Sequence, residues 1–238
     1  MKASPSFRTA SIRISIFALP VLLLTAPLRS QPAVEPDLQS VLAFHEPLIA
    51  LTHVRIIDGT GAPPRADQTI IVDHGRILAA GNASSTDIPD GARKLDLTGD
   101  TVYPGLVGMH EHLFYPSFEP PTGTMPLYAE QAFSAPRLYL AAGVTTARTA
   151  GSLEPYTDLN VRRLIEKHAM PGPTLDVSGP YIQGPGGFAI QMPSITSPEQ
   201  AARLVDYWAA EGVTSFKAYM NISHDALASA IQAAHRHG

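Results

Sequence analysis

Residues 100–113 have the sequence DTVYPGLVGMHEHL, and this segment gives the strongest indication of the fold. Pro104 and Gly105 mark a boundary between two elements, because both residue types interrupt regular structure. The apolar residues that follow are predicted to form a strand that runs to the end of the stretch. Alternate residues of a strand point to the same face. The strand therefore brings the imidazoles of His110 and His112 together at its carboxyl end.

Five short runs before this stretch alternate with turns and predict a small β module at residues 49–103. The expected strands cover residues 51–57, 69–73, 76–80, 94–97 and 101–103. His74-Gly75, between the second and third runs, is typical of a tight hairpin, because glycine tolerates the positive φ of such a turn. The fourth and fifth runs are expected to pair with each other around Gly99.

The chain after residue 104 changes to alternating strands and helices. Strands are expected at residues 105–113, 144–148, 174–178 and 213–219, and helices at residues 135–142, 156–168, 198–211 and 224–237. Ser134 and Ser223 are expected to cap the first and last helix. Ser197–Gln200 matches a capping box for the helix at residues 198–211, with proline at the first helical position. Strand followed by helix, four times over, predicts an α/β fold with a parallel sheet covered by helices.

Composition places the chain among globular proteins and excludes several kinds of chemistry. The 238 residues are 45% hydrophobic and 16% charged, which leaves enough apolar material for a buried core. The net charge of −4, with the two signs mixed, indicates neither a nucleic-acid partner nor a basic membrane patch. The absence of cysteine excludes disulfides, thiolate ligands and thiol nucleophiles, whereas nine histidines remain for metal binding or proton transfer.

The N-terminus has the pattern of a secretory signal peptide, which we assign to residues 1–30. Basic residues precede the apolar run ISIFALPVLLLT at residues 14–25. This run is too short to span a bilayer comfortably, which favours a cleaved signal over a membrane anchor. We therefore expect an exported protein, periplasmic or extracellular, without a stable membrane anchor. Residues 31–48, which carry three prolines, are expected to be a linker.

Lys217, on the strand predicted at residues 213–219, is a third candidate functional residue besides His110 and His112. It shares a strand face with Ser215 and Tyr219, whereas the apolar residues between them point toward the covering helices. Burial disfavours the charge of a lysine and lowers its pKa. A structural role is the alternative for each of these residues. His110 and His112 could simply be two polar residues at a strand end, and Lys217 could form an ion pair in the interior.

Arg148, Tyr181 and Gln183 are the candidate substrate-binding residues. Arg148 ends the second strand of the alternating region and is equally suited to fix a loop. Tyr181 and Gln183 lie in the segment SGPYIQGPGGFAIQ at residues 178–191, whose glycines and prolines suit a shaped loop over a site. An ordinary surface loop is the alternative. The segment is not a phosphate loop, because it lacks the Gly-Lys-Ser/Thr ending.

Four segments together resemble the opening of amidohydrolase superfamily enzymes, in particular the imidazolonepropionase- and prolidase-like branch. They are VRIIDGTG at residues 54–61, IIVDHGRILAAG at 70–81, the stretch at 100–113, and GVTTAR at 143–148. The resemblance implies that residues 49–103 are part of a β-sandwich and that residues 104–238 are the first half of a (β/α)8 TIM barrel. It also implies an N-terminal fragment, because four strands do not close such a barrel.

The resemblance implies a metal-dependent hydrolase with His110, His112 and Lys217 as metal ligands. One or two divalent ions would bind there, and zinc is the preferred candidate. Lys217 would be carbamylated where two ions are present. The implied reaction is hydrolysis of a carbon–nitrogen bond, in a non-standard peptide amide or a cyclic amide of a small-molecule substrate, through a metal-activated water. The aspartate expected as catalytic base lies beyond the end of this chain. The chain alone is therefore expected to be inactive and poorly stable.

Two alternatives belong to other classes of protein. A non-catalytic relative would keep the fold for binding or assembly, and a mononuclear deaminase-type enzyme would leave Lys217 unmodified. Intact His110, His112 and Lys217 argue against the non-catalytic alternative. The number of metal ions per chain separates the two enzyme alternatives, since the hydrolase with a carbamylated lysine would bind two and the deaminase-type enzyme one. A homo-oligomer is compatible with each alternative.

Overall fold

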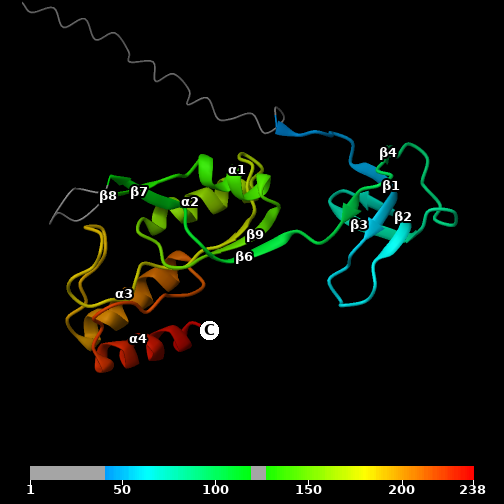
Figure 1. The fold of residues 1–238 in the computed structure, drawn as a ribbon. Coiled ribbons are helices and arrows are strands. Elements are labelled where there is room, and N and C mark those ends of the chain that lie inside the picture. The colour runs from blue at the N-terminus through cyan, green and yellow to red at the C-terminus, as the bar shows by residue number, and fades with distance from the viewer. Residues whose placement is uncertain (1–40, 119–126) are drawn as a thin grey trace, which may run out of the picture. The chain divides into compact units, whose positions relative to one another are not determined.

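The computed structural model describes residues 41–118 and 127–238 and shows a mixed α/β protein (Figure 1). The strands are β1 (Leu48–Ile56), β2 (Arg65–Asp73), β3 (Arg76–Asn82), β4 (Arg93–Asp96), β5 (Thr101–Val102), β6 (Leu106–Glu111), β7 (Phe114–Phe118), β8 (Leu127–Glu130), β9 (Val144–Thr149) and β10 (Thr174–Asp176). The helices are α1 (Ser134–Ala141), α2 (Pro155–Glu166), α3 (Pro198–Glu211) and α4 (His224–Arg236). The expected signal peptide and most of the expected linker lie outside the described residues. Within the two described ranges, no helix has the length and apolar character needed to cross a membrane.

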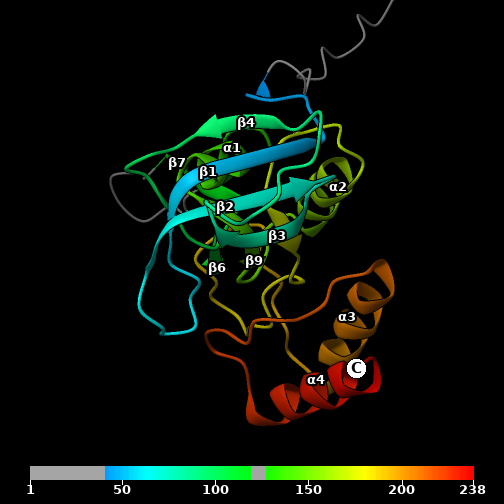
Figure 2. The ribbon, with the colours of Figure 1, turned by 90° about the vertical axis from the view of Figure 1, so that its right-hand side faces the viewer.

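The N-terminal sheet contains β1 to β5, and its elements agree with the alternating pattern of the sequence. The strands lie in the order β3-β2-β1-β4 (Figure 2), and β5 also pairs with β1. β1 is antiparallel to β2, and β2 is antiparallel to β3. Val54, Ile56 and Ile70 form a small buried cluster in this sheet. The five predicted strands are thus confirmed as elements.

One predicted pairing in this sheet is wrong. β4 and β5 do not pair with each other around Gly99, because each of them lies parallel to β1. The backbone N–H of Leu97 donates to Thr52 O, and that of Arg55 donates to Asp100 O, both at 3.0 Å. The chain therefore follows the same edge of β1 through the turn and does not reverse.

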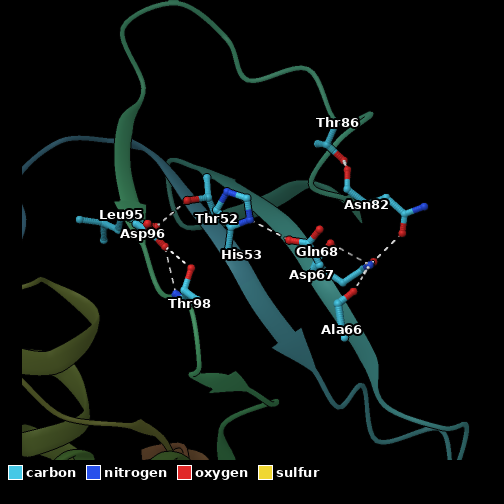
Figure 3. Close-up of polar contacts among 10 residues, drawn as sticks. All are labelled: Thr52, His53, Ala66, Asp67, Gln68, Asn82, Thr86, Leu95, Asp96 and Thr98. Atoms are coloured by element: carbon cyan, nitrogen blue, oxygen red, sulfur yellow. Dashed lines mark hydrogen bonds and ion pairs between the residues drawn. The ribbon is translucent and has the colours of Figure 1, made fainter.

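The hairpin between β2 and β3 turns at His74-Gly75, as predicted. Both residues have positive φ, 46° and 73°, which is the conformation that a two-residue hairpin turn requires. Side-chain contacts fasten the neighbouring strands (Figure 3). His53 Nδ1 of β1 lies 2.7 Å from Asp67 Oδ1 of β2, and Gln68 Nε2 donates to Asn82 Oδ1 of β3 at 2.8 Å.

The second sheet is parallel throughout, with the strand order β10-β9-β6. α1 packs against β9 (Figure 1), and α2 packs against β10. Ala147 of β9 and Leu175 of β10 share a buried cluster with Leu159 and Val161 of α2. Arg148, next to Ala147, points to the opposite face of the sheet. The predicted alternation of strands and helices is confirmed for this region.

The fourth predicted strand, at residues 213–219, is wrong as a continuous element. Two isolated parallel bridges join this segment to the chain that follows β10. Gly179 and Ile182 donate their backbone N–H groups to the carbonyls of Ser215 and Lys217. The donors are three residues apart and the acceptors are two apart, so an extra residue interrupts the regular ladder.

α3 and α4 pack against each other (Figures 1 and 2), and the predicted serines cap both N-termini. Ser197 and Ser223 each accept a backbone N–H of the first turn through Oγ, at 3.2 Å and 3.3 Å. The second contact of the predicted capping box is displaced by one residue, because Gln200 Oε1 accepts the backbone N–H of Thr196 at 2.9 Å. The cap predicted at Ser134 is wrong, because Ser134 is the first residue of α1 and Phe133 holds the cap position. The Ser134 hydroxyl instead donates to Gln131 Oε1 at 3.1 Å.

β7 and β8 form an antiparallel pair that the sequence did not predict. A proline at position 116 hides the strand pattern of β7, because proline is rare inside strands. The pair contributes rings to a buried aromatic cluster. This aromatic cluster consists of Phe114, Tyr128, Tyr181, Phe188 and Tyr219.

Candidate metal centre

The predicted His-x-His pair lies at the carboxyl end of β6. His110 is in the strand, and His112 comes directly after its last residue, Glu111. The ring centroids of the two histidines lie 5.4 Å apart, with an angle of 78° between the planes. The strand therefore brings both imidazoles together, as predicted, and His112 is the more buried of the two.

His112 is fixed by hydrogen bonds to both its backbone and its ring. The hydroxyl of Tyr139 in α1 donates to His112 O at 2.7 Å and accepts the His112 N–H at 3.3 Å. His112 Nδ1 lies 3.2 Å from Gly151 O. A carbonyl oxygen only accepts, so Nδ1 carries the proton and Nε2 keeps its lone pair. Burial lowers the pKa of His112, which favours the neutral imidazole that a metal needs.

Lys217 reaches the same place from the segment at residues 213–219. Its Nζ lies 3.3 Å from Nε2 of His110. The ring centroids of Tyr181 and Tyr219 lie 5.4 Å and 5.3 Å from Nζ, so two aromatic faces enclose the amine. Burial lowers the pKa of Lys217. His110 and Lys217 also line a common cavity of about 230 Å³.

These three side chains fit a divalent ion, although they do not complete a site. Neutral imidazole nitrogens are common zinc ligands, and a lysine amine of lowered pKa is available to form a carbamate, which behaves as a carboxylate. In the described part of the chain, no three His, Cys, Asp or Glu side chains come together closely enough to hold a metal ion. A structural or catalytic zinc ion takes about four ligands. At least one further ligand is therefore needed.

Arg148, a predicted substrate contact, lines the same cavity as His110 and Lys217. Its Nε lies 3.7 Å from Asp176 Oδ2, and the hydroxyl of Thr214 donates a hydrogen bond to Asp176. Both charged side chains are partly exposed, so the ion pair contributes little to stability. It chiefly orients the guanidinium. The role of Arg148 in substrate binding stays a prediction.

Tyr181 and Gln183, the other predicted substrate contacts, are both buried, with 2% and 1% of their surface exposed. Tyr181 belongs to the aromatic cluster and faces Lys217. Gln183 does not line the cavity, and its amide packs against Gly187. Neither amide atom has a hydrogen-bond partner among the described residues. Only Tyr181 therefore lies beside the candidate ligands, and both roles stay predictions.

A group of residues that supports His112 was missed by the sequence reasoning. The N–H of Gly151 donates to Ser178 Oγ at 2.7 Å, and Ser178 Oγ lies 3.1 Å from Thr149 Oγ1. Gly151 has a φ of 87°, and a Cβ at this position would lie 2.8 Å from the Tyr181 ring. Glycine is therefore required here. Gly151, just after a strand, could have been recognised in the sequence as a position that needs positive φ. The contact between the Ser178 and Thr149 hydroxyls could not, because only the fold brings them together.

Glu130, at the end of β8, and Asp158, in α2, are buried acids that the sequence did not reveal. Their carboxylate oxygens lie out of contact with solvent, and among the described residues they make no hydrogen bond of good geometry. The Ser152 hydroxyl near Asp158 and the Glu154 backbone N–H near Glu130 each lower the pKa of that carboxyl group, and burial outweighs both. Burial raises the pKa of Asp158 to about 7. Burial, with the charge of Asp158 as the next cause, raises the pKa of Glu130 to about 8. Protons therefore remain on these groups close to neutral pH.

Similarity to known proteins comes from solved structures, since no protein-family model and no curated protein matches the chain. A Bifidobacterium longum protein provisionally assigned as a prolidase is 28% identical, with a TM-score of 0.65, over 80% of this chain and 47% of that one. A Xaa-Pro dipeptidase with methionine bound in its active site is 18% identical, with a TM-score of 0.64, over 80% and 55%. Molinate hydrolase is 21% identical, with a TM-score of 0.57, over 82% and 53%.

These similarities confirm the predicted resemblance to the amidohydrolase superfamily. The chain shares a fold with these structures over most of its own length. It spans about half the length of the structures that it matches.

Proposed function

We propose that this chain supplies part of a metal-dependent hydrolase that cleaves a carbon–nitrogen bond in an amide or cyclic amide. The observation that carries the proposal is the 3.3 Å approach of Lys217 Nζ to His110 Nε2, beside the ring of His112. Similarity to a prolidase-like protein, a dipeptidase and a hydrolase supports this class of reaction. In this proposal β6, β9 and β10 are strands of a (β/α)8 barrel, and the N-terminal sheet is part of a β-sandwich.

His110, His112 and Lys217 are the residues that would hold a divalent ion, zinc in the first place. Such an ion, when bound, supplies a Lewis acid for a carbonyl oxygen and activates water for attack. His112 contributes a neutral nitrogen donor, because its Nδ1 is committed to Gly151 O. Lys217 would contribute as a carbamate where two ions bind, and its lowered pKa supports that chemistry.

Arg148 is proposed to bind and orient the substrate. Its Nε faces Asp176, and the rest of the planar guanidinium offers further donors on the cavity shared with His110 and Lys217. Paired guanidinium donors of this kind bind a carbonyl or carboxylate oxygen. Tyr181 is proposed to close the site beside Lys217, where its buried ring excludes water.

The proposal assigns the remaining metal ligands and the catalytic base to residues outside this chain. The chain spans about half the length of the structures that it matches, which supports this assignment. The isolated chain would then bind zinc through an incomplete ligand set and hydrolyse amides poorly. Export to the periplasm or the extracellular space is a further proposal, and it depends on residues 1–30 alone.

Titration of zinc into the metal-free full chain tests the proposal. His110→Ala, His112→Ala and Lys217→Met should each weaken zinc binding at least about 10-fold, because each removes one donor atom. His224→Ala is the control, since His224 is exposed at the start of α4, and this variant should bind zinc like the wild type. Equal zinc affinity in the wild type and all three site variants would contradict the proposal.

A further inference from the structure

His112 lies at the point where the regular hydrogen bonds of β6 end. The last bond that joins this edge to the chain of β9 runs from the Ala150 N–H to Glu111 O, at 2.9 Å. The next residue, His112, is outside the strand and only partly exposed. Its backbone N–H and C=O therefore need partners from outside the sheet, because unpaired backbone groups away from water are costly.

The hydroxyl of Tyr139 satisfies both backbone groups of His112. It donates its proton to His112 O at 2.7 Å, and its oxygen accepts the His112 N–H at 3.3 Å. A hydroxyl has one donor and two lone pairs, so it can make both bonds at once. Because both bonds end on one residue, they restrain the position and the direction of the His112 backbone together.

The position of the Tyr139 side chain is restrained because its helix, α1, is packed against the rest of the fold. α1 contacts β9, and the Tyr139 side chain packs against the buried cluster that includes Ala147 and Leu159. A ring held in this way has little rotamer freedom left. The position of its hydroxyl is therefore set by the packing of α1 and not by the surrounding solvent.

The ring of His112 has a separate anchor, since Nδ1 lies 3.2 Å from Gly151 O. Backbone and ring anchors together determine where Nε2 points. We propose that Tyr139 is a positioning residue of the metal centre, which acts through His112 and touches neither metal nor substrate. This inference depends on the proposed function, because it assigns Tyr139 to the support of a metal ligand.

Tyr139→Phe, in the full chain, removes the hydroxyl and keeps the ring. We expect zinc affinity to fall about 10–100-fold, which is the range for groups that orient a metal ligand. In the metal-free protein, we expect the His112 amide to exchange with deuterium at least about 10-fold faster, because its hydrogen bond is lost. Tyr103→Phe removes an exposed hydroxyl just after β5 and should change neither quantity.

A second variant, Tyr139→Leu, separates hydrogen bonding from packing. If Tyr139 only fills space, Tyr139→Phe will behave like the wild type and Tyr139→Leu alone will be defective, which would overturn the inference. Unchanged His112 amide exchange in Tyr139→Phe would overturn it as well. If the wild-type chain binds no zinc, the proposed function fails, and the exchange rates then decide independently whether Tyr139 fixes His112.

Discussion

The two sides of the candidate centre differ in how firmly the fold holds them. We call residues 106–112 with 149–151 the His112 side, and residues 213–219 the Lys217 side. On the His112 side, β9 is paired on both edges, by β6 and by β10. On the Lys217 side, isolated bridges hold one edge of the segment, and Ala218 is exposed.

This difference indicates that the candidate centre combines one firmly held side chain, His112, with one adjustable side chain, Lys217. His112 has hydrogen-bonded anchors on its backbone and its ring. Lys217 has a flexible four-carbon stem, and its amine is placed by two tyrosine rings and by His110. Substitutions on the His112 side should therefore affect folding as well as metal binding, whereas substitutions on the Lys217 side should affect metal binding alone.

Gly151→Ala should have the largest effect and would test the rigidity of the His112 side. The added Cβ would meet the Tyr181 ring at 2.8 Å, in a backbone conformation with a φ of 87° that alanine disfavours. We expect the free energy of unfolding to fall by about 2–4 kcal/mol, from backbone strain and overpacking together. Chemical denaturation of the full chain measures this change.

Gly61→Ala is the matched control for this substitution. Gly61 has a similar φ of 84°, and a Cβ there would meet no atom within 4 Å. Backbone strain alone should therefore cost about 1 kcal/mol. Equal losses for Gly61→Ala and Gly151→Ala would mean that the contact with Tyr181 contributes nothing to the rigidity of the His112 side.

Asp158→Asn should have the next largest effect, and the effect should depend on pH. Asp158 lies in α2, the helix that follows Gly151, and burial raises its pKa to about 7 from about 4 in the unfolded chain. Between these values the folded state holds a proton that the unfolded state has lost, so stability falls as the pH rises from about 4 to about 7. At pH 7.5 we expect asparagine to stabilise the fold by about 1–3 kcal/mol.

The same variant should nearly match the wild type at about pH 4, where the aspartate is protonated in the folded chain and about half protonated in the unfolded chain. Denaturation curves at both pH values measure the difference. Asp90→Asn, at an exposed position in the N-terminal region, is the control and should change stability little at either pH. A destabilised Asp158→Asn variant at pH 7.5 would refute the assignment of a buried, unpaired carboxyl group.

Lys217→Met should have the smallest effect on folding. The substitution removes the amine from between Tyr181 and Tyr219, and contacts of this kind at partly exposed sites are worth about 0.5–1 kcal/mol each. Methionine recovers much of that energy through its own contact with the rings. We expect the unfolding free energy to stay within about 1 kcal/mol of the wild type, while zinc affinity falls. A loss as large as that of Gly151→Ala would remove the distinction between the two sides.

Much of the local structure could be predicted because short sequence signals determine it. His74-Gly75 supplied the positive φ values of the β2–β3 turn, and Ser197 and Ser223 supplied hydroxyls that cap α3 and α4. The approach of Lys217 to His110 also agreed with a prediction from strand alternation. The approach occurs although residues 213–219 form isolated bridges and no continuous strand, and Ala218, which was expected to face the covering helices, is exposed.

The remaining features depend on contacts that no local pattern encodes. Tyr139 lies 27 positions from His112 in the chain, and a tyrosine in an amphipathic helix is an ordinary packing residue until α1 is placed. Nothing in the local sequence distinguishes Glu130 and Asp158 from exposed acidic residues, because their burial depends on the fold. The parallel course of β4 and β5 beside β1 likewise follows from backbone bonds between distant residues.

X-ray absorption spectroscopy of the zinc-loaded full chain would show whether His110 and His112 bind the same ion in the proposed site with Lys217. We expect two imidazole rings bound to zinc in the wild type and one in either histidine variant, His110→Ala or His112→Ala. A spectrum without imidazole scattering in the wild type, or one unchanged in both variants, would mean that these histidines are not zinc ligands.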